Sequence, residues 1–150
     1  MSFDSFLKTF DTIEALSNFD IITKCKEMDI TNFTGVFMID ELNKNREASE
    51  NECLILNIDH SSNRGSHWVS LFIQNGVCYY FDSYEFQPPV EVEEYLHKFE
   101  KRHYNSFEIQ KPNQIICGHF CIYMLFKLCN GYEFKHILDE LYKYNIINIK

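Results

Sequence analysis

Residues 110–129 read QKPNQIICGHFCIYMLFKLC, a polar approach followed by a long apolar run. From Cys117 to Cys129 nearly every position is apolar, which predicts a helix buried on almost all sides. Such a helix places the thiol of Cys117 in its first turn, at the edge of the core. The question is why a thiol followed by a glycine occupies that position.

The first turn of a helix favours an ionised thiol. Its backbone N–H groups have no partner within the helix, and the helix dipole favours a negative charge there. Both effects lower the pKa of a thiol, and the thiolate is the nucleophilic form. Ile115 and Ile116 are poor capping residues, so we expect these N–H groups to remain available to an oxyanion. Gly118 would let a substrate carbonyl approach closely, and Gln110 or Gln114 could supply a second donor.

A predicted hairpin brings a histidine near a carboxylate. Two β-rich runs, HWVSLFIQ and VCYYFDSY, flank Asn75 and Gly76, the favoured pair of a type I′ turn. With these residues in the turn, Val69 faces Asp82. His67 and Asp82 then lie on the same face of the hairpin as diagonal neighbours. The carboxylate could then fix the tautomer of the imidazole and stabilise its protonated form.

Other interpretations of these residues stay open. His67 could cap a strand end and Asp82 could begin a turn, without any chemical role. Glu85 follows closely and is a second carboxylate near the same histidine. Asp59 and His60 are adjacent, so in a strand they would point to opposite faces and orient each other poorly.

Neither the remaining cysteines nor a possible metal site indicates a second functional site. Five cysteines are expected to be small core residues, mostly within apolar runs: Cys25, Cys53, Cys78, Cys121 and Cys129. A metal site at Cys117, His119 and Cys121 is not expected, because alternate positions on a helix diverge and no second ligand pair has zinc spacing.

The rest of the chain predicts a single α+β domain over residues 1–150, with a central sheet and flanking helices. Asp20 is expected to cap a second short helix, and Phe134 to open the last one. The other expected elements are helices over 3–17, 90–103 and 117–129 and strands over 35–39, 53–58 and 106–110.

Composition excludes several classes of protein. The net charge of −8 is the opposite of that of a basic nucleic-acid binder. No apolar stretch approaches the ~18 residues of a membrane span, and the beginning MSFDSFLKTF lacks the basic region of a signal peptide. We therefore expect a protein that folds in a reducing, cytosol-like compartment.

Three segments together, GSHWVSLF, CYYFDSY and QKPNQIICGHFC, resemble the adenain-like (adenovirus maturation protease) family of cysteine proteases. The clan of that family includes the SUMO proteases. Its pattern is His-Trp, an acid about fifteen residues later, and a Gln seven residues before Cys-Gly. FTGVFMIDEL at 33–42 is similar to a segment found in that branch and in proteases of virophages and Maverick/Polinton elements. The resemblance covers about residues 33–130.

The resemblance implies a papain-like α+β fold with the nucleophile at the start of a buried helix. Carried over by position, Cys117 would be the nucleophile, His67 the general base and Asp82 the acid that orients it. Gln110 would be the oxyanion donor, since it precedes Pro-Asn at the family distance and Gln114 does not.

Two further residues are expected to bind substrate. Trp68 would wall the cleft beside the histidine, and Gly118 would border the path of the substrate; plain core packing is the alternative for Trp68.

The chain departs from the adenovirus pattern in two places. Asp82 stands where adenovirus enzymes have Glu, as on the SUMO-protease side, and Glu85 stands where relatives often have Gly.

The resemblance also implies a function. We expect a monomeric thiol endopeptidase that processes capsid or core precursor proteins at small, Gly-rich sites during virion maturation. It would act in the virion and the infected host cell. Adenovirus enzymes use a viral peptide and DNA as activating cofactors; here the charge disfavours DNA, so no cofactor is expected. The alternatives are a protease acting on Gly-Gly-ended ubiquitin-like modifiers and an inactive binding module of the same fold.

Overall fold

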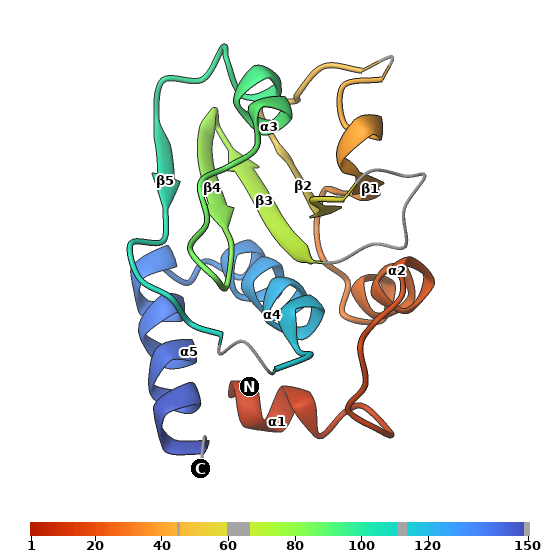
Figure 1. Cartoon of the computed structure of the whole chain (residues 1–150), viewed down its shortest axis with the longest axis vertical. Coiled ribbons are helices and arrows are strands. Elements are labelled where there is room, and N and C mark those ends of the chain that lie inside the picture. Colours follow the sequence, from red (N-terminus) through yellow and green to blue (C-terminus); the bar gives the residue numbers. More distant parts are fainter. Residues whose placement is uncertain (45, 60–66, 111–113, 149–150) are drawn as a thin grey trace.

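The computed structural model describes residues 1–44, 46–59, 67–110 and 114–148. Within these ranges, a mixed sheet of five strands in the order β1-β2-β3-β4-β5 forms the centre of the molecule (Figure 1). The outer pairs, β1 with β2 and β4 with β5, are parallel, and the inner pairs are antiparallel. The strands are β1 (Phe33–Met38), β2 (Glu52–Asn57), β3 (Trp68–Gln74), β4 (Val77–Phe81) and β5 (Arg102–Tyr104). The α+β architecture predicted from the sequence is confirmed.

The helices cover the two faces of the sheet unequally. The helical elements are α1 (Phe3–Leu7), α2 (Asn18–Glu27), the 3₁₀ turn η1 (Ile39–Glu41), α3 (Val90–Tyr95), α4 (Cys117–Cys129) and α5 (Phe134–Asn148). Helix α4 lies against one face and is surrounded by α1, α2 and α5, which share its apolar cluster (Figure 1). Helix α3 and η1 pack with a smaller cluster on the other face. Alternation along β2 explains this division, because Cys53 and Ile55 join the first cluster while Leu54 and Leu56 join the second.

The hairpin forms as predicted. Asn75 and Gly76 both have positive φ, 50° and 76°, as a type I′ turn requires. Ser70 pairs with Phe81 and Gln74 with Val77, which is the predicted register. Helix α4 also has its predicted bounds, and its central residues are fully buried. The hairpin and α4 are therefore the two scaffolds that hold the candidate site.

The first predicted helix is much shorter than expected. Helix α1 ends at Leu7, and residues 8–17 cross the molecule without regular structure. The ring of Phe10 packs on the ring of His119 in α4, with centroids 4.7 Å apart, and the carbonyl of Leu16 accepts a hydrogen bond from the Trp68 indole. These tertiary contacts outweigh the helical periodicity. Helix α2 is capped by Ser17, whose hydroxyl accepts from the N–H of Asp20, so Asp20 is the partner in a capping box rather than the cap.

Two expectations after the hairpin are also wrong. The helix predicted over 90–103 ends at Tyr95, and residues 102–104 instead pair with β4 as a parallel strand. No strand forms over 106–110. The N–H groups of Ile109 and Gln110 both donate to the carbonyl of Ser83, at 2.8 Å each, so this backbone holds the loop after β4 instead of joining the sheet.

Candidate active site

A histidine and a carboxylate meet at the end of the hairpin. His67 precedes β3 and Asp82 follows β4, and both are buried, 5% and 1% exposed. The Nε2–H of His67 donates to Oδ1 of Asp82 at 2.7 Å. The same oxygen accepts the backbone N–H of Tyr84 at 2.8 Å. This arrangement leaves Nδ1 as the nitrogen that is free to face a third group.

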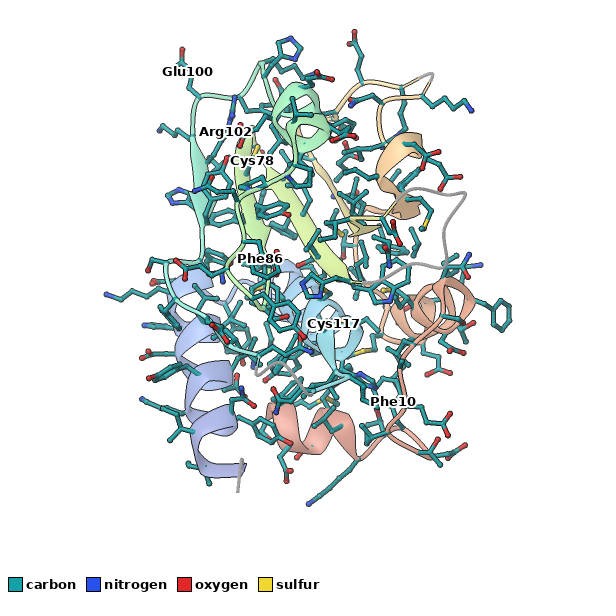
Figure 2. The ribbon with its side chains drawn as sticks, viewed as in Figure 1. Phe10, Cys78, Phe86, Glu100, Arg102 and Cys117 are labelled. Atoms are coloured by element: carbon teal, nitrogen blue, oxygen red, sulfur yellow. The ribbon has the colours of Figure 1, made fainter. Side chains whose placement is uncertain are left out.

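That third group is the thiol of Cys117, which begins α4 (Figure 2). Burial is the largest effect on this thiol and raises its pKa. Hydrogen bonds from His67 and from the backbone N–H groups of Trp68 and Gly118, with the charge of the imidazole, outweigh burial and lower the pKa below its ordinary value. No side chain caps the helix at Ile116, as the sequence predicted. The start of α4 therefore stabilises a thiolate.

The pKa of the imidazole moves in the opposite direction. Burial alone would lower the pKa of His67, but the hydrogen bonds to Asp82 and Cys117 and the charges of both groups raise it from 6.5 to about 9. A lowered thiol pKa beside a raised imidazole pKa favours the thiolate–imidazolium pair over the neutral pair. Such a pair can attack an electrophilic carbon and then protonate a leaving group.

Four of the other thiols lie in an environment that disfavours the thiolate. All six cysteines are free, and burial raises the pKa of Cys25 to about 12, that of Cys78 to about 11, and that of Cys53 and Cys121 as well. Cys117 is half-buried and its pKa moves down. The expectation that the buried cysteines are core residues is confirmed for these four.

The structure separates the two glutamines. The side chain of Gln110 is 1% exposed, its Oε1 accepts from the hydroxyl of Ser83 at 2.6 Å, and its Nε2 donates to the carbonyl of Gln114. The amide of Gln114 turns away and donates to Asn145 on α5. One of the two amide hydrogens of Gln110 is used by the Gln114 carbonyl, so the second can serve a ligand. Gln110 is thus fixed to the loop that carries Asp82.

Trp68 and Gly118 pack against each other. A Cβ at Gly118 would lie 3.3 Å from a ring carbon of Trp68 and 3.3 Å from a methyl of Leu16. The space beside Gly118 is filled by protein, so the glycine lets the segment before α2 close over the start of α4. Trp68 is 9% exposed and donates to the carbonyl of Leu16 at 3.0 Å. Contact of either residue with a substrate stays a prediction.

Sequence reasoning missed the residues that support the acid. Asn105 is buried, accepts the N–H of Asp82 with Oδ1 at 3.1 Å, and returns a hydrogen bond from Nδ2 to the carbonyl of Asp82 at 2.7 Å. The ring of Tyr84 lies over the ring of His67, with centroids 4.5 Å apart. Ser83 anchors Gln110. Asn105 gives no local signal, since its role depends on a loop that folds back from β5, whereas Ser83 and Tyr84 are direct neighbours of Asp82.

The alternatives from the sequence have different outcomes. Glu85 is exposed and lies in a left-handed conformation with φ 62°, the conformation a glycine adopts readily. The carboxylate that the imidazole contacts is that of Asp82. His60 lies outside the described residues, so the expectation that it and Asp59 orient each other poorly stays a prediction. Among the residues described, no group of three His, Cys, Asp or Glu side chains is arranged to hold a metal ion.

Comparison with known proteins finds one similar sequence and several similar folds. No protein-family model matches the chain. A putative thiol protease of Acanthamoeba polyphaga mimivirus, R355, is 29% identical over 107 residues, which are 63% of this chain and 35% of that protein. The crystal structure of the ASFV pS273R protease superposes with a TM-score of 0.54 and 16% identity, covering 87% of this chain and 65% of that chain. The chain has the fold of the ASFV pS273R protease.

The resemblance predicted from the sequence is confirmed as a similarity to a viral thiol protease in sequence and to the ASFV pS273R protease in fold. The SUMO protease Ulp1 also matches, with a TM-score of 0.37 and 15% identity over 95% of this chain and 71% of that chain. The chain spans about a third of the length of the mimivirus relative and just under two thirds of the pS273R protease chain. The likeness to virophage and Maverick/Polinton proteases stays a prediction.

Proposed function

We propose that the chain is a thiol endopeptidase. The observation that carries the proposal is the hydrogen-bonded series Asp82–His67–Cys117, with its lowered thiol pKa and raised imidazole pKa. A buried thiol without such partners would be a poor nucleophile, as the other core cysteines are.

The proposed reaction proceeds through an acyl-enzyme. The Cys117 thiolate attacks the scissile carbonyl carbon, and the oxyanion is held by the side-chain amide of Gln110 and the backbone N–H of Cys117. His67 gives its proton to the leaving amine, and Asp82 keeps the ring oriented. His67 then takes a proton from a water molecule that attacks the thioester carbon; the acyl product leaves as a carboxylic acid, and the Cys117 thiolate and protonated His67 are restored.

The proposed substrate is a capsid or core precursor protein of a virus, cut after small residues such as Gly-Gly or Ala-Gly. The viral origin of the mimivirus and ASFV relatives supports this choice. We further propose a single domain acting as a monomer, without a bound cofactor, in the virion and the infected cell. Among the described residues, no helix has both the length and the apolar character to cross a membrane.

One observation favours a second candidate. The acid is Asp82 rather than Glu, the choice made on the SUMO-protease side of the clan. The alternative function is therefore cleavage after the Gly-Gly end of ubiquitin-like modifiers, which requires the same chemistry.

One cleavage experiment tests both functions. Wild-type protein and Cys117→Ala are incubated with a peptide library containing Gly-Gly and Ala-Gly sites, and with SUMO and ubiquitin fusions. Endopeptidase function predicts cleavage of the library after small residues that Cys117→Ala abolishes. Cleavage restricted to the fusions would select the alternative. Absence of all cleavage, with Cys117 alkylated no faster than the other thiols, would instead indicate an inactive binding module.

A further inference from the structure

A small pocket lies beside the candidate active site, on the face of the sheet that carries α3. It has a volume of about 230 Å³, and Tyr80, Glu85, Phe86, Glu93 and Tyr104 contribute to its walls. Small-molecule pockets usually measure about 300–1,000 Å³. The pocket is therefore suited to a single long side chain rather than to a cofactor.

The pocket contains a buried polar atom without a partner. Tyr80 is 2% exposed, yet its hydroxyl makes no hydrogen bond with the described residues. Buried hydroxyls nearly always have a partner, so this hydroxyl has a hydrogen-bonding capacity that a ligand in the pocket would satisfy. Burial, followed by the charge of Asp82, raises the pKa of Tyr80, so the group remains a neutral hydroxyl.

The walls of the pocket favour a cation. Glu93 is paired with Arg102 at 2.7 Å, which leaves Glu85 as a wall carboxylate without an ion pair among the described residues. Phe86 and Tyr104 are 60% and 38% exposed and offer aromatic faces. A cation over an aromatic ring and beside a carboxylate is stabilised by both.

The pocket lies on the side of the active site where the part of the substrate after the cleaved bond would pass. The ring of Phe86 lies 6.5 Å from that of His67 and 5.4 Å from that of Tyr84, on the segment that follows β4 (Figure 2). In the proposed reaction His67 protonates the leaving amine, so the part of the substrate after the bond passes on its side. An extended chain advances about 3.3 Å per residue, so the pocket is reached about two residues beyond the cut.

We propose that this pocket is a subsite for the lysine or arginine side chain of a substrate, two or three residues after the cleaved bond. The ammonium or guanidinium donates to Glu85 and to the Tyr80 hydroxyl, and the aliphatic stem lies against Phe86 and Tyr104. Glu85 then has a reason for its left-handed backbone, since strained residues concentrate where a ligand is held. This subsite rests on the endopeptidase function.

The test compares matched substrates within each variant. Quenched fluorescent peptides carry one Gly-Gly site and differ only in Lys, Ala or Glu at the second and third positions after the cut. For wild type we expect kcat/KM for Lys to exceed that for Ala by about tenfold, the effect of one partly exposed cation site. Glu85→Gln and Tyr80→Phe should each reduce the Lys/Ala ratio to about threefold or less. Glu100→Gln, the same charge change at an exposed position that does not line this pocket, should keep the ratio of wild type.

A binding measurement separates failure of the subsite from failure of the endopeptidase function. Cys117→Ala protein is titrated with the Lys and Ala peptides. Cleavage with equal rates for Lys and Ala would overturn the subsite while leaving the endopeptidase intact. No cleavage, but tighter binding of the Lys peptide that Glu85→Gln abolishes, would keep the cation site and reject the endopeptidase. Equal binding of both peptides to an inactive protein would reject both.

Discussion

One buried histidine, His67, contacts the Cys117 thiol, a second, His119, lies in the first turn of α4, and the two differ in every partner. His67 is 5% exposed and bonded to Asp82 and Cys117, and its pKa rises to about 9. His119, two residues into α4, is fully buried, both of its ring nitrogens lack a hydrogen-bond partner among the described residues, and burial followed by the charge of Lys24 lowers its pKa to about 4. Its ring packs against Phe10 at 4.7 Å.

The difference shows that burial alone does not decide the charge of a histidine. Desolvation acts on both rings in the same direction and favours the neutral form. A fixed carboxylate and a thiol reverse its effect at His67, whereas an aromatic ring and a lysine leave it in force at His119. The two residues are therefore matched probes, one on the proposed chemistry and one on packing.

The largest expected effect separates their roles in turnover. His67→Ala should lower kcat/KM by about 10³-fold or more, because the general base and the imidazolium partner of the thiolate are both lost. His119→Leu should stay within a few-fold of wild type. Steady-state cleavage of a Gly-Gly peptide measures both. A comparable loss in the two variants would mean that α4, rather than the imidazole of His67, limits activity.

The next effect sharpens the role of the carboxylate. Asp82→Asn keeps the shape of the side chain but removes the charge that helps to raise the pKa of His67. We expect a loss of roughly 10²-fold in kcat/KM and a lower imidazole pKa in the pH profile. NMR titration of the His67 ring checks the second point. An unchanged imidazole pKa would show that Cys117 alone sustains it.

The last effect concerns stability rather than turnover, and its dependence on pH has opposite signs for the two histidines. The folded state favours protonated His67, so its contribution is complete below the unfolded pKa of about 6.5 and is lost as pH rises toward about 9. The folded state favours neutral His119, so stability falls as pH drops from about 6.5 to about 4, by on the order of 3 kcal/mol.

Urea unfolding across this pH range measures both slopes. His119→Leu should flatten the acid side and leave the alkaline side as it is. Because leucine also removes two unsatisfied buried nitrogens, it should raise the free energy of unfolding at pH 7 by about 1 kcal/mol. An acid slope that survives in His119→Leu would assign it to other groups.

The sequence predicted those parts of the site that depend on residues close to one another in the chain. The Asn75-Gly76 turn fixes the register that joins His67 to Asp82, and the apolar run fixes the bounds of α4. Both depend on residues close in sequence, whose turn chemistry and periodicity are strong. The position of the thiol at the first turn of α4 followed from the same run.

The supports of the site depend on distant contacts and were missed. Asn105 reaches Asp82 from beyond β5, and Leu16 is held by Trp68 across more than fifty residues of chain. The shortening of the first helix follows from the second contact, since Phe10 and Leu16 bind other elements instead of their own turns. The sequence pattern of residues 8–17 does not indicate which side chains of α4 they will contact.

The central claim is that Cys117 is ionised by its partners at a pH where the four fully buried thiols are not. The direct measurement is the rate of iodoacetamide alkylation of each cysteine as a function of pH, resolved by peptide mass spectrometry. The account predicts that Cys117 reacts fastest, with a half-maximal rate at a pH below that of an ordinary cysteine, and that His67→Ala shifts this midpoint upward. A Cys117 profile that coincides with an ordinary thiol and does not respond to His67→Ala would contradict it.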